Sequence, residues 1–200
     1  MKTRLLLVVF AITLVFASCA TQSVSRVDSS KQIDLSGYWN DTDLKLVCET
    51  LINDCLTSPR VEQASAKKRD LPVIIVGSFR NDSDEHIDTS IITKRMESAI
   101  LNSGKADFVA SKFERAEIRD ERTEQQGWAS EETAKALANE TGADFILTGS
   151  VKTIVDKAGK TAVRTYFVYG ELTDLETNKK IWIGENSGIK KVIKTAGAKF

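Results

Sequence analysis

Apolar residues in the first half of the chain follow two different spacings. Between residues 44 and 55 they recur three and four positions apart, after N-cap candidates at residues 40–43 (NDTD), which is typical of an amphipathic helix. Ser58 and Pro59 suit the start of a second, more polar helix. Residues 71–79 (LPVIIVGSF) form a continuous apolar run instead, which favours a central strand covered on both faces.

Polar segments separate the next elements. Residues 80–88 (RNDSDEHID) form a polar loop, after which Thr89 is a plausible N-cap of a helix that ends at Gly104. A short strand over residues 106–109 follows. This part of the chain therefore predicts a strand–helix–strand unit.

Two further helices and three strands complete the pattern. Ser111 begins a strongly charged helix with the spacing of a capping box, and Ser130 begins another. Three strands joined by short turns then form an antiparallel meander over residues 143–156, 161–175 and 180–193. Together these elements predict the α/β class, with a mixed, mostly antiparallel sheet of about five strands flanked by helices.

The chain begins with an export signal. Lys2 and Arg4 precede an apolar run over residues 5–17, whose helix would be about 20 Å long, too short for a hydrocarbon core of about 30 Å. Two small residues then stand directly before Cys19. This arrangement resembles the lipobox of bacterial lipoproteins, in which the cysteine is acylated and becomes the first residue of the mature chain. An ordinary secretory signal with an incidental cysteine is the alternative.

We therefore expect three regions along the chain. Residues 1–18 are a lipoprotein signal peptide, residues 19–32 a flexible tether from lipidated Cys19, and residues 33–200 a single globular α/β domain. At about 3.5 Å per residue the thirteen residues that follow Cys19 reach at most about 45 Å. In lipoproteins generally an aspartate after the cysteine retains the protein at the inner membrane, so Ala20 implies transport to the outer membrane.

Charge and cysteine usage narrow the possible functions. The chain carries 28 basic and 28 acidic residues, and loss of Lys2 and Arg4 with the signal peptide leaves a slightly acidic protein. It therefore has no electrostatic footprint for nucleic acid or for anionic lipid. Cys48 and Cys55 would lie about 10 Å apart along one helix, beyond the roughly 7 Å limit for a disulfide, so we expect buried thiols.

Sequence motifs for catalysis are missing. The chain has one histidine and no dinucleotide, phosphate-loop or nucleophile-elbow motif, so we expect no enzyme, no cofactor and no metal. The most suggestive segment is the polar loop over residues 80–88, because α/β folds place sites after central strands. It suits a structural loop that caps backbone amides, a protein-contact loop, or a metal site that departs from the calcium-loop pattern.

Four phrases, taken in order, resemble one protein family. They are residues 35–43 (LSGYWNDTD), 72–89 (PVIIVGSFRNDSDEHIDT), 136–151 (ALANETGADFILTGSV) and 171–185 (ELTDLETNKKIWIGE). Over residues 33–193 the chain resembles the LpoB-type outer-membrane lipoproteins, which activate bifunctional penicillin-binding proteins. The resemblance implies a small domain similar to the N-terminal domain of TolB. It also implies function by contact with a periplasmic docking domain of the synthase, which stimulates glycan polymerisation and cross-linking.

No motif of the resemblance marks the contact surface, so we select it from the residues themselves. We expect partner binding by the polar loop and by a tryptophan that suits a surface anchor, through Arg80, Asn81, Asp82, Glu85, His86 and Trp128. The hypothesis is an outer-membrane-anchored lipoprotein with its domain in the periplasm that regulates peptidoglycan synthesis. The alternative is a structural or assembly lipoprotein of the envelope with a TolB-like domain that can form oligomers.

Overall fold

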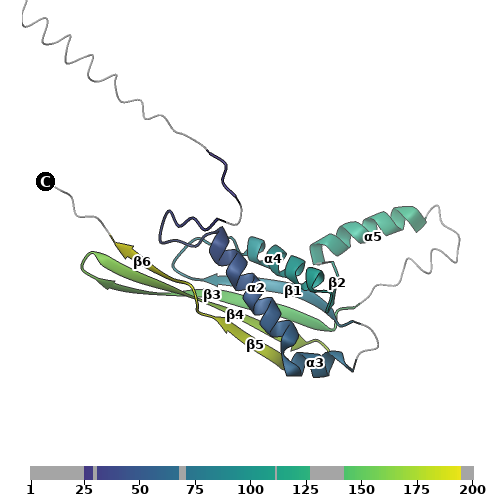
Figure 1. Cartoon of the computed structure of the whole chain (residues 1–200). Coiled ribbons are helices and arrows are strands. Elements are labelled where there is room, and N and C mark those ends of the chain that lie inside the picture. The colour runs from purple at the N-terminus through teal and green to yellow at the C-terminus, as the bar shows by residue number, and fades with distance from the viewer. Residues whose placement is uncertain (1–24, 29–30, 68–70, 111, 127–141, 195–200) are drawn as a thin grey trace, which may run out of the picture. The chain divides into compact units, whose positions relative to one another are not determined.

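The computed structural model describes residues 25–28, 31–67, 71–110, 112–126 and 142–194. The chain divides into two compact units, Met1–Ile33 and Asp34–Phe200. The described residues of the first unit contain no helix or strand, and the expected signal peptide with Cys19 lies outside the described residues. All the elements below belong to the second unit (Figure 1).

Helix α2 (Asp41–Thr57) begins at a capping box. The side chain of Asn40 accepts a hydrogen bond from the amide of Asp43 at 3.0 Å, and the Asp43 carboxylate accepts one from the amide of Asn40 at 3.0 Å. Two of the backbone donors at the helix start are thereby satisfied. Helix α3 (Pro59–Ser65) follows with Ser58 as its N-cap, so both predicted helices are confirmed.

Helix α4 (Thr89–Ser103) starts one residue away from its predicted cap. Asp88, and not Thr89, is the N-cap, because the Asp88 carboxylate accepts a hydrogen bond from the amide of Ser90 at 3.0 Å. Gly104 ends the helix in the left-handed conformation that its sequence position predicts. The charged helix α5 (Lys112–Gln126) follows, and Lys94 of α4 contacts it through Glu114 at 2.6 Å.

In the described part of the chain, six strands form one sheet. They are β1 (Val73–Asp82), β2 (Asp107–Phe108), β3 (Phe145–Ala158), β4 (Thr161–Asp174), β5 (Lys180–Asn186) and β6 (Lys190–Lys194). The order is β2-β1-β3-β4-β5, with β6 also paired to β4. Strand β1 is parallel to β2 and β3, and the three pairs that include β4 are antiparallel. The predicted α/β class with a mixed, mostly antiparallel sheet is confirmed.

Most strand ends are shifted by one or two residues from those predicted, and two differences are larger. The last strand, predicted as one over residues 180–193, is divided into β5 and β6. Asn186 causes the division, because its side-chain oxygen accepts a hydrogen bond from the amide of Gly188 at 3.1 Å and turns the backbone out of the ladder. Strand β1 continues to Asp82, so the loop begins three residues later than predicted. The helix predicted from Ser130 lies outside the described residues.

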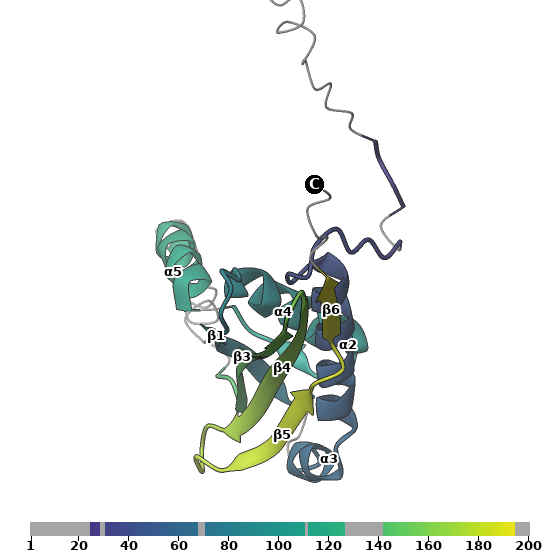
Figure 2. The same ribbon diagram turned by 90° about the vertical axis from the view of Figure 1, so that its left-hand side faces the viewer.

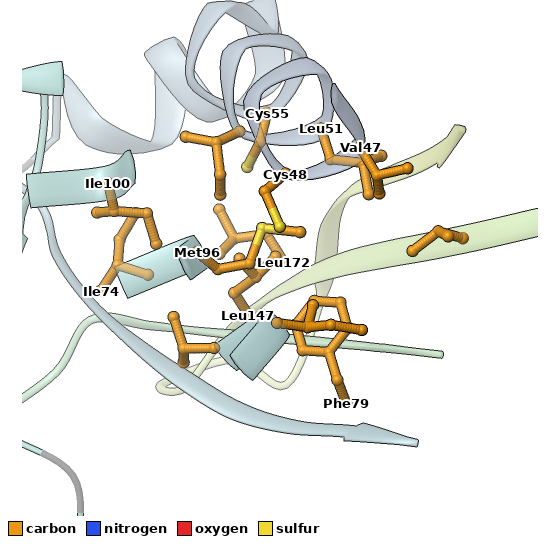
Figure 3. Close-up of a cluster of buried hydrophobic side chains, with 14 of the residues drawn as sticks. Val47, Cys48, Leu51, Cys55, Ile74, Phe79, Met96, Ile100, Leu147 and Leu172 are labelled. Atoms are coloured by element: carbon orange, nitrogen blue, oxygen red, sulfur yellow. The ribbon is translucent and has the colours of Figure 1, made fainter. Parts of the chain in front are cut away.

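The core lies between one face of the sheet and the helices α2 and α4, which lie side by side (Figures 1 and 2). Figure 3 shows Cys48 and Leu51 of α2 and Met96 of α4 above Leu147 and Leu172 of the sheet. Each of these side chains is at most 2% exposed, and burial of a side chain of this size contributes about 1.5–3 kcal/mol. The opposite face of the sheet was also predicted to be covered. Val73, Ile75 and Ile146 on that face are half-buried, and its covering by other elements stays a prediction.

Alkaline pH should destabilise the protein through the two core thiols. Cys48 and Cys55 are free and buried, as expected, and burial raises the pKa of each from 9.0 to about 12. The unfolded chain therefore loses these protons first, so the stabilisation present below pH 9 is lost as the pH rises toward 12. We expect the free energy of unfolding, measured by urea unfolding, to fall by about 1 kcal/mol per thiol between pH 9 and pH 10.

The variant with Cys48→Ala and Cys55→Ala is the control for this prediction. Its stability should be lower at pH 8, because the core loses volume, but should fall much less between pH 9 and pH 10. If the free energy of unfolding fell equally with pH in the variant and in the native chain, the two thiols would not be the cause. Rapid reaction of the native protein with an aqueous thiol reagent would contradict the burial itself.

Candidate functional site

The polar loop over residues 83–88 is held by its own side chains. Asn81 at the end of β1 donates from its side-chain nitrogen to the carbonyl oxygen of Glu85 at 2.7 Å. Its side-chain oxygen accepts from the amide of Ser83 at 3.1 Å and from the hydroxyl of Ser83 at 2.5 Å. These are the hydrogen bonds that the structural-loop alternative predicts, so the loop has a defined conformation.

A buried arginine joins this loop to the sheet. The Arg164 guanidinium of β4 lies 2.9 Å from Oε1 of Glu85 and 2.8 Å from Oδ2 of Asp84. The side chains of Glu85 and Arg164 are only 5% and 10% exposed, whereas Asp84 is 47% exposed. Glu85 also accepts a hydrogen bond from the hydroxyl of Tyr166 at 2.5 Å. We call Arg164, Tyr166, Asp84 and Glu85 the latch.

The contacts within the latch shift the pKa values of Asp84 and Tyr166. The hydroxyl of Thr153, at 2.6 Å, and then Arg164 lower the pKa of Asp84 below its ordinary value. Burial, and then the hydrogen bond to the Glu85 carboxylate, raise the pKa of Tyr166 above its ordinary value. At neutral pH the latch therefore contains a charged Asp84 and an uncharged, hydrogen-bonded tyrosine.

The latch also holds the segment that leads into α2. We call residues 34–40 the strap. The amide of Trp39 donates to Oε2 of Glu85 at 3.0 Å, and the carbonyl oxygen of Gly37 accepts from the hydroxyl of Tyr166 at 3.2 Å. The Tyr38 ring packs on the guanidinium of Arg164 at 5.0 Å from its centroid, an arrangement that suits a cation–π contact.

A second ion cluster fastens the strap to β6. Lys191 lies 2.6 Å from Oδ2 of Asp43 and 3.3 Å from Oδ1 of Asp34. Its ammonium group also donates to the carbonyl oxygen of Tyr38 at 2.7 Å. Asp43 thus caps α2 and pairs with β6 at once. Strap, loop and sheet edge form one rigid polar assembly at this end of the domain.

A surface groove of about 620 Å³ runs between the strap, the loop and the start of α4. Tyr38 of the strap, Leu44 of α2, His86 of the loop and Ile91 of α4 contribute to its walls. Tyr38 and Ile91 are 59% and 54% exposed, so the groove offers apolar surface to a partner.

The residues expected to bind a partner are only partly brought together. Glu85 and His86 line the groove, with His86 exposed and Glu85 buried in the latch. Arg80 is exposed, pairs with Asp82 at 3.7 Å and lines a smaller depression elsewhere on the sheet. Asn81 supports the loop, and Trp128 lies outside the described residues. Binding of a partner by this set stays a prediction.

Sequence reasoning missed Arg164, Tyr166 and the strap. One signal for Arg164 was available, because it stands at an inward position of the alternating run over residues 161–172, where a charge needs a buried partner. Nothing in the sequence identified Glu85 as that partner.

The described part of the chain has neither a membrane-spanning helix nor a metal-binding cluster. None of its helices is long and apolar enough to cross a membrane. No group of three or more histidine, cysteine, aspartate or glutamate side chains there is placed to hold a metal ion.

Comparison with known proteins places the chain in a family. The family model described as "Peptidoglycan-synthase activator LpoB" matches residues 43–187. The chain is similar to the LpoB C-terminal domain from Salmonella enterica, with 17% identity and a TM-score of 0.43 over 76% of this chain and 99% of that one. It is likewise similar to the LpoB C-terminal domain from Escherichia coli, with 17% identity and a TM-score of 0.46 over 72% and 96% of the two chains. No curated protein matches.

The family match covers well over half of the chain, including all but the first two residues of α2, β1 to β5 and the whole latch. It confirms the family resemblance that four sequence phrases indicated. The chain belongs to the LpoB family of peptidoglycan-synthase activators.

Proposed function

We propose that this protein is an outer-membrane lipoprotein that binds a bifunctional penicillin-binding protein in the periplasm and activates it. The family match over residues 43–187 is the observation that carries this proposal. The exposed apolar groove beside a rigid loop supports it, because a prearranged surface loses little conformational entropy when a partner binds.

The anchor is the second part of the proposal. Cys19 follows two small residues and a short apolar run, and Ala20 stands where an inner-membrane protein would carry an aspartate. Acylated Cys19 attaches the domain to the outer membrane through residues 20–32. A tether of at most about 45 Å means that the synthase must present its docking domain close to the outer membrane.

Activation should be visible with purified components. The full chain, extracted from membranes in detergent, is added to its host's bifunctional penicillin-binding protein in a glycan polymerisation assay. We expect a faster rate and a stable complex in a pulldown, with no turnover by the lipoprotein alone. Absence of both binding and stimulation would overturn the proposal. A stable oligomer of the lipoprotein in light scattering would then favour the assembly alternative.

Replacement of Cys19 by alanine tests the anchor in cells. We expect Cys19→Ala to remain unprocessed or to leave the outer membrane, because the acylated residue is lost. The measurement is membrane fractionation combined with intact-protein mass. Cys48→Ala is the matched control, because it also removes a thiol but lies in the core. A Cys19→Ala protein of mature mass in the outer-membrane fraction would contradict the lipidation.

A further inference from the structure

The groove beside the strap combines an apolar floor with acidic walls. Tyr38 and Ile91 expose more than half of their side-chain surface there, with the half-buried Leu44 between the strap and α4. Both exposed residues belong to segments that are held in place. Tyr38 is in the strap, which packs on Arg164, and Ile91 is in the first turn of α4, which Asp88 caps. A rigid apolar depression of this kind suits a single large side chain of a partner.

Carboxylates dominate the charges around this depression. Four of them contribute to its lining: Asp41, Asp84, Glu85 and Asp88. Arg164 is the cation of the latch and lies against both Asp84 and Glu85, so one negative charge of that pair remains uncompensated. Asp41 and Asp88 are exposed and add two more. The groove therefore carries a negative potential over an apolar surface.

We propose that the groove binds a segment of the synthase that carries an apolar side chain next to lysine or arginine. The apolar side chain occupies the space between Tyr38 and Ile91, and the basic neighbours face Asp41 and Asp88. This inference rests on the proposed function and adds the place of contact and the chemistry of the partner. Acidic or purely polar segments do not fit, because they would bring like charges together or leave the apolar floor in water.

Two single substitutions test the two parts of this chemistry. Ile91→Ala removes the apolar wall, and Asp41→Lys reverses an exposed charge at the rim. Leu101→Ala is the control for the first, since Leu101 lies on the same helix and is 58% exposed but outside the groove. Glu49→Lys is the control for the second, since Glu49 is an exposed acid on the same helix, α2.

Binding of each full-length variant to the synthase is measured by titration in detergent. We expect each groove variant to raise Kd at least about tenfold, as anchor residues do, and the controls to leave it within about twofold. Raising the salt concentration should weaken the native complex more than the Asp41→Lys complex, because one attractive pair is already lost. Circular dichroism spectroscopy checks that each variant is folded.

The outcomes separate this inference from the proposed function. If the native chain binds and stimulates the synthase while both groove variants bind equally well, the groove inference is overturned and the function stands. If the native chain neither binds nor stimulates, the proposed function falls and the groove inference falls with it. A photo-crosslinking amino acid at position 91 identifies the segment directly. Capture of a synthase segment with an apolar residue beside lysine or arginine supports the inference, and capture of an acidic segment overturns it.

Discussion

Replacement of Arg164 by methionine should lower the free energy of unfolding by about 3 kcal/mol. The substitution leaves the carboxylate of Glu85 buried beside Tyr166 without its cation, and an unpaired buried charge is strongly destabilising. We expect the lower end of the usual range of about 3–5 kcal/mol, because Asp84 is 47% exposed and lets water approach. Urea unfolding followed by tryptophan fluorescence measures the loss.

Two further variants serve as controls for Arg164→Met. Lys180→Met breaks a surface pair with Glu171, whose side chains are 53% and 34% exposed, and should change stability little. Adding Glu85→Gln to Arg164→Met removes the unpaired charge and should restore part of the loss, so the two effects are not additive. A double variant less stable than the sum of its singles would contradict a latch built on this ion pair.

The latch also links stability to the proposed contact surface. Tyr38 lies on Arg164, and the amide of Trp39 is bound to Glu85, so release of the latch frees one wall of the groove. At temperatures where Arg164→Met is still folded, we therefore expect weaker binding of the synthase. Unchanged binding by the folded variant would mean that the groove keeps its shape without the latch.

Replacement of Gly149 by alanine should cost about 3 kcal/mol, at the upper end of the range for overpacking a core. A Cβ atom at this position of β3 would lie 2.4 Å from the carbonyl oxygen of Tyr169 on β4 and closer still to the ring of Phe79. The Phe79 ring could turn away only by leaving a cavity. The carbonyl group of Tyr169 is part of the backbone of β4, which is paired with β3, so it cannot move away without disturbing the sheet. Thermal unfolding followed by circular dichroism measures the effect.

Gly188 provides the matched control for this substitution. A Cβ atom there would meet only Oδ1 of Asn186, at an ordinary contact distance of 3.6 Å, and its backbone is not in the left-handed region. Gly188→Ala should therefore be neutral or slightly stabilising, because it restricts the unfolded chain. Equal losses at Gly149 and Gly188 would show that close packing against Phe79 and Tyr169 is not the cause.

Local patterns predicted most of the secondary structure correctly. The capped stripe of α2, the glycine end of α4 and the apolar run of β1 depend on neighbours a few residues away, and the sequence contains these neighbours. Errors arose where one hydrogen bond competes with a periodic pattern. Asn186 divides the last strand, and Asp88 replaces Thr89 as the cap.

The candidate site was predicted less well, because charge alone does not show whether a side chain faces water. Glu85 and His86 are adjacent in an acidic loop, yet one is buried by Arg164 and the other is exposed. Their difference depends on a residue 79 positions away.

The sequence by itself determined the family and the class of fold, since ordered phrases and hydrophobic periodicity are local properties of the chain. Only the tertiary structure decided which polar residues support the fold and which face water. Packing of β4 against the loop and the strap brings Arg164 and Tyr166 to Glu85, which lies 81 positions before Tyr166 in the sequence. Burial then fixes their roles, because a charge removed from water must be paired, while Asp41 and Ile91 beside them stay available for contact.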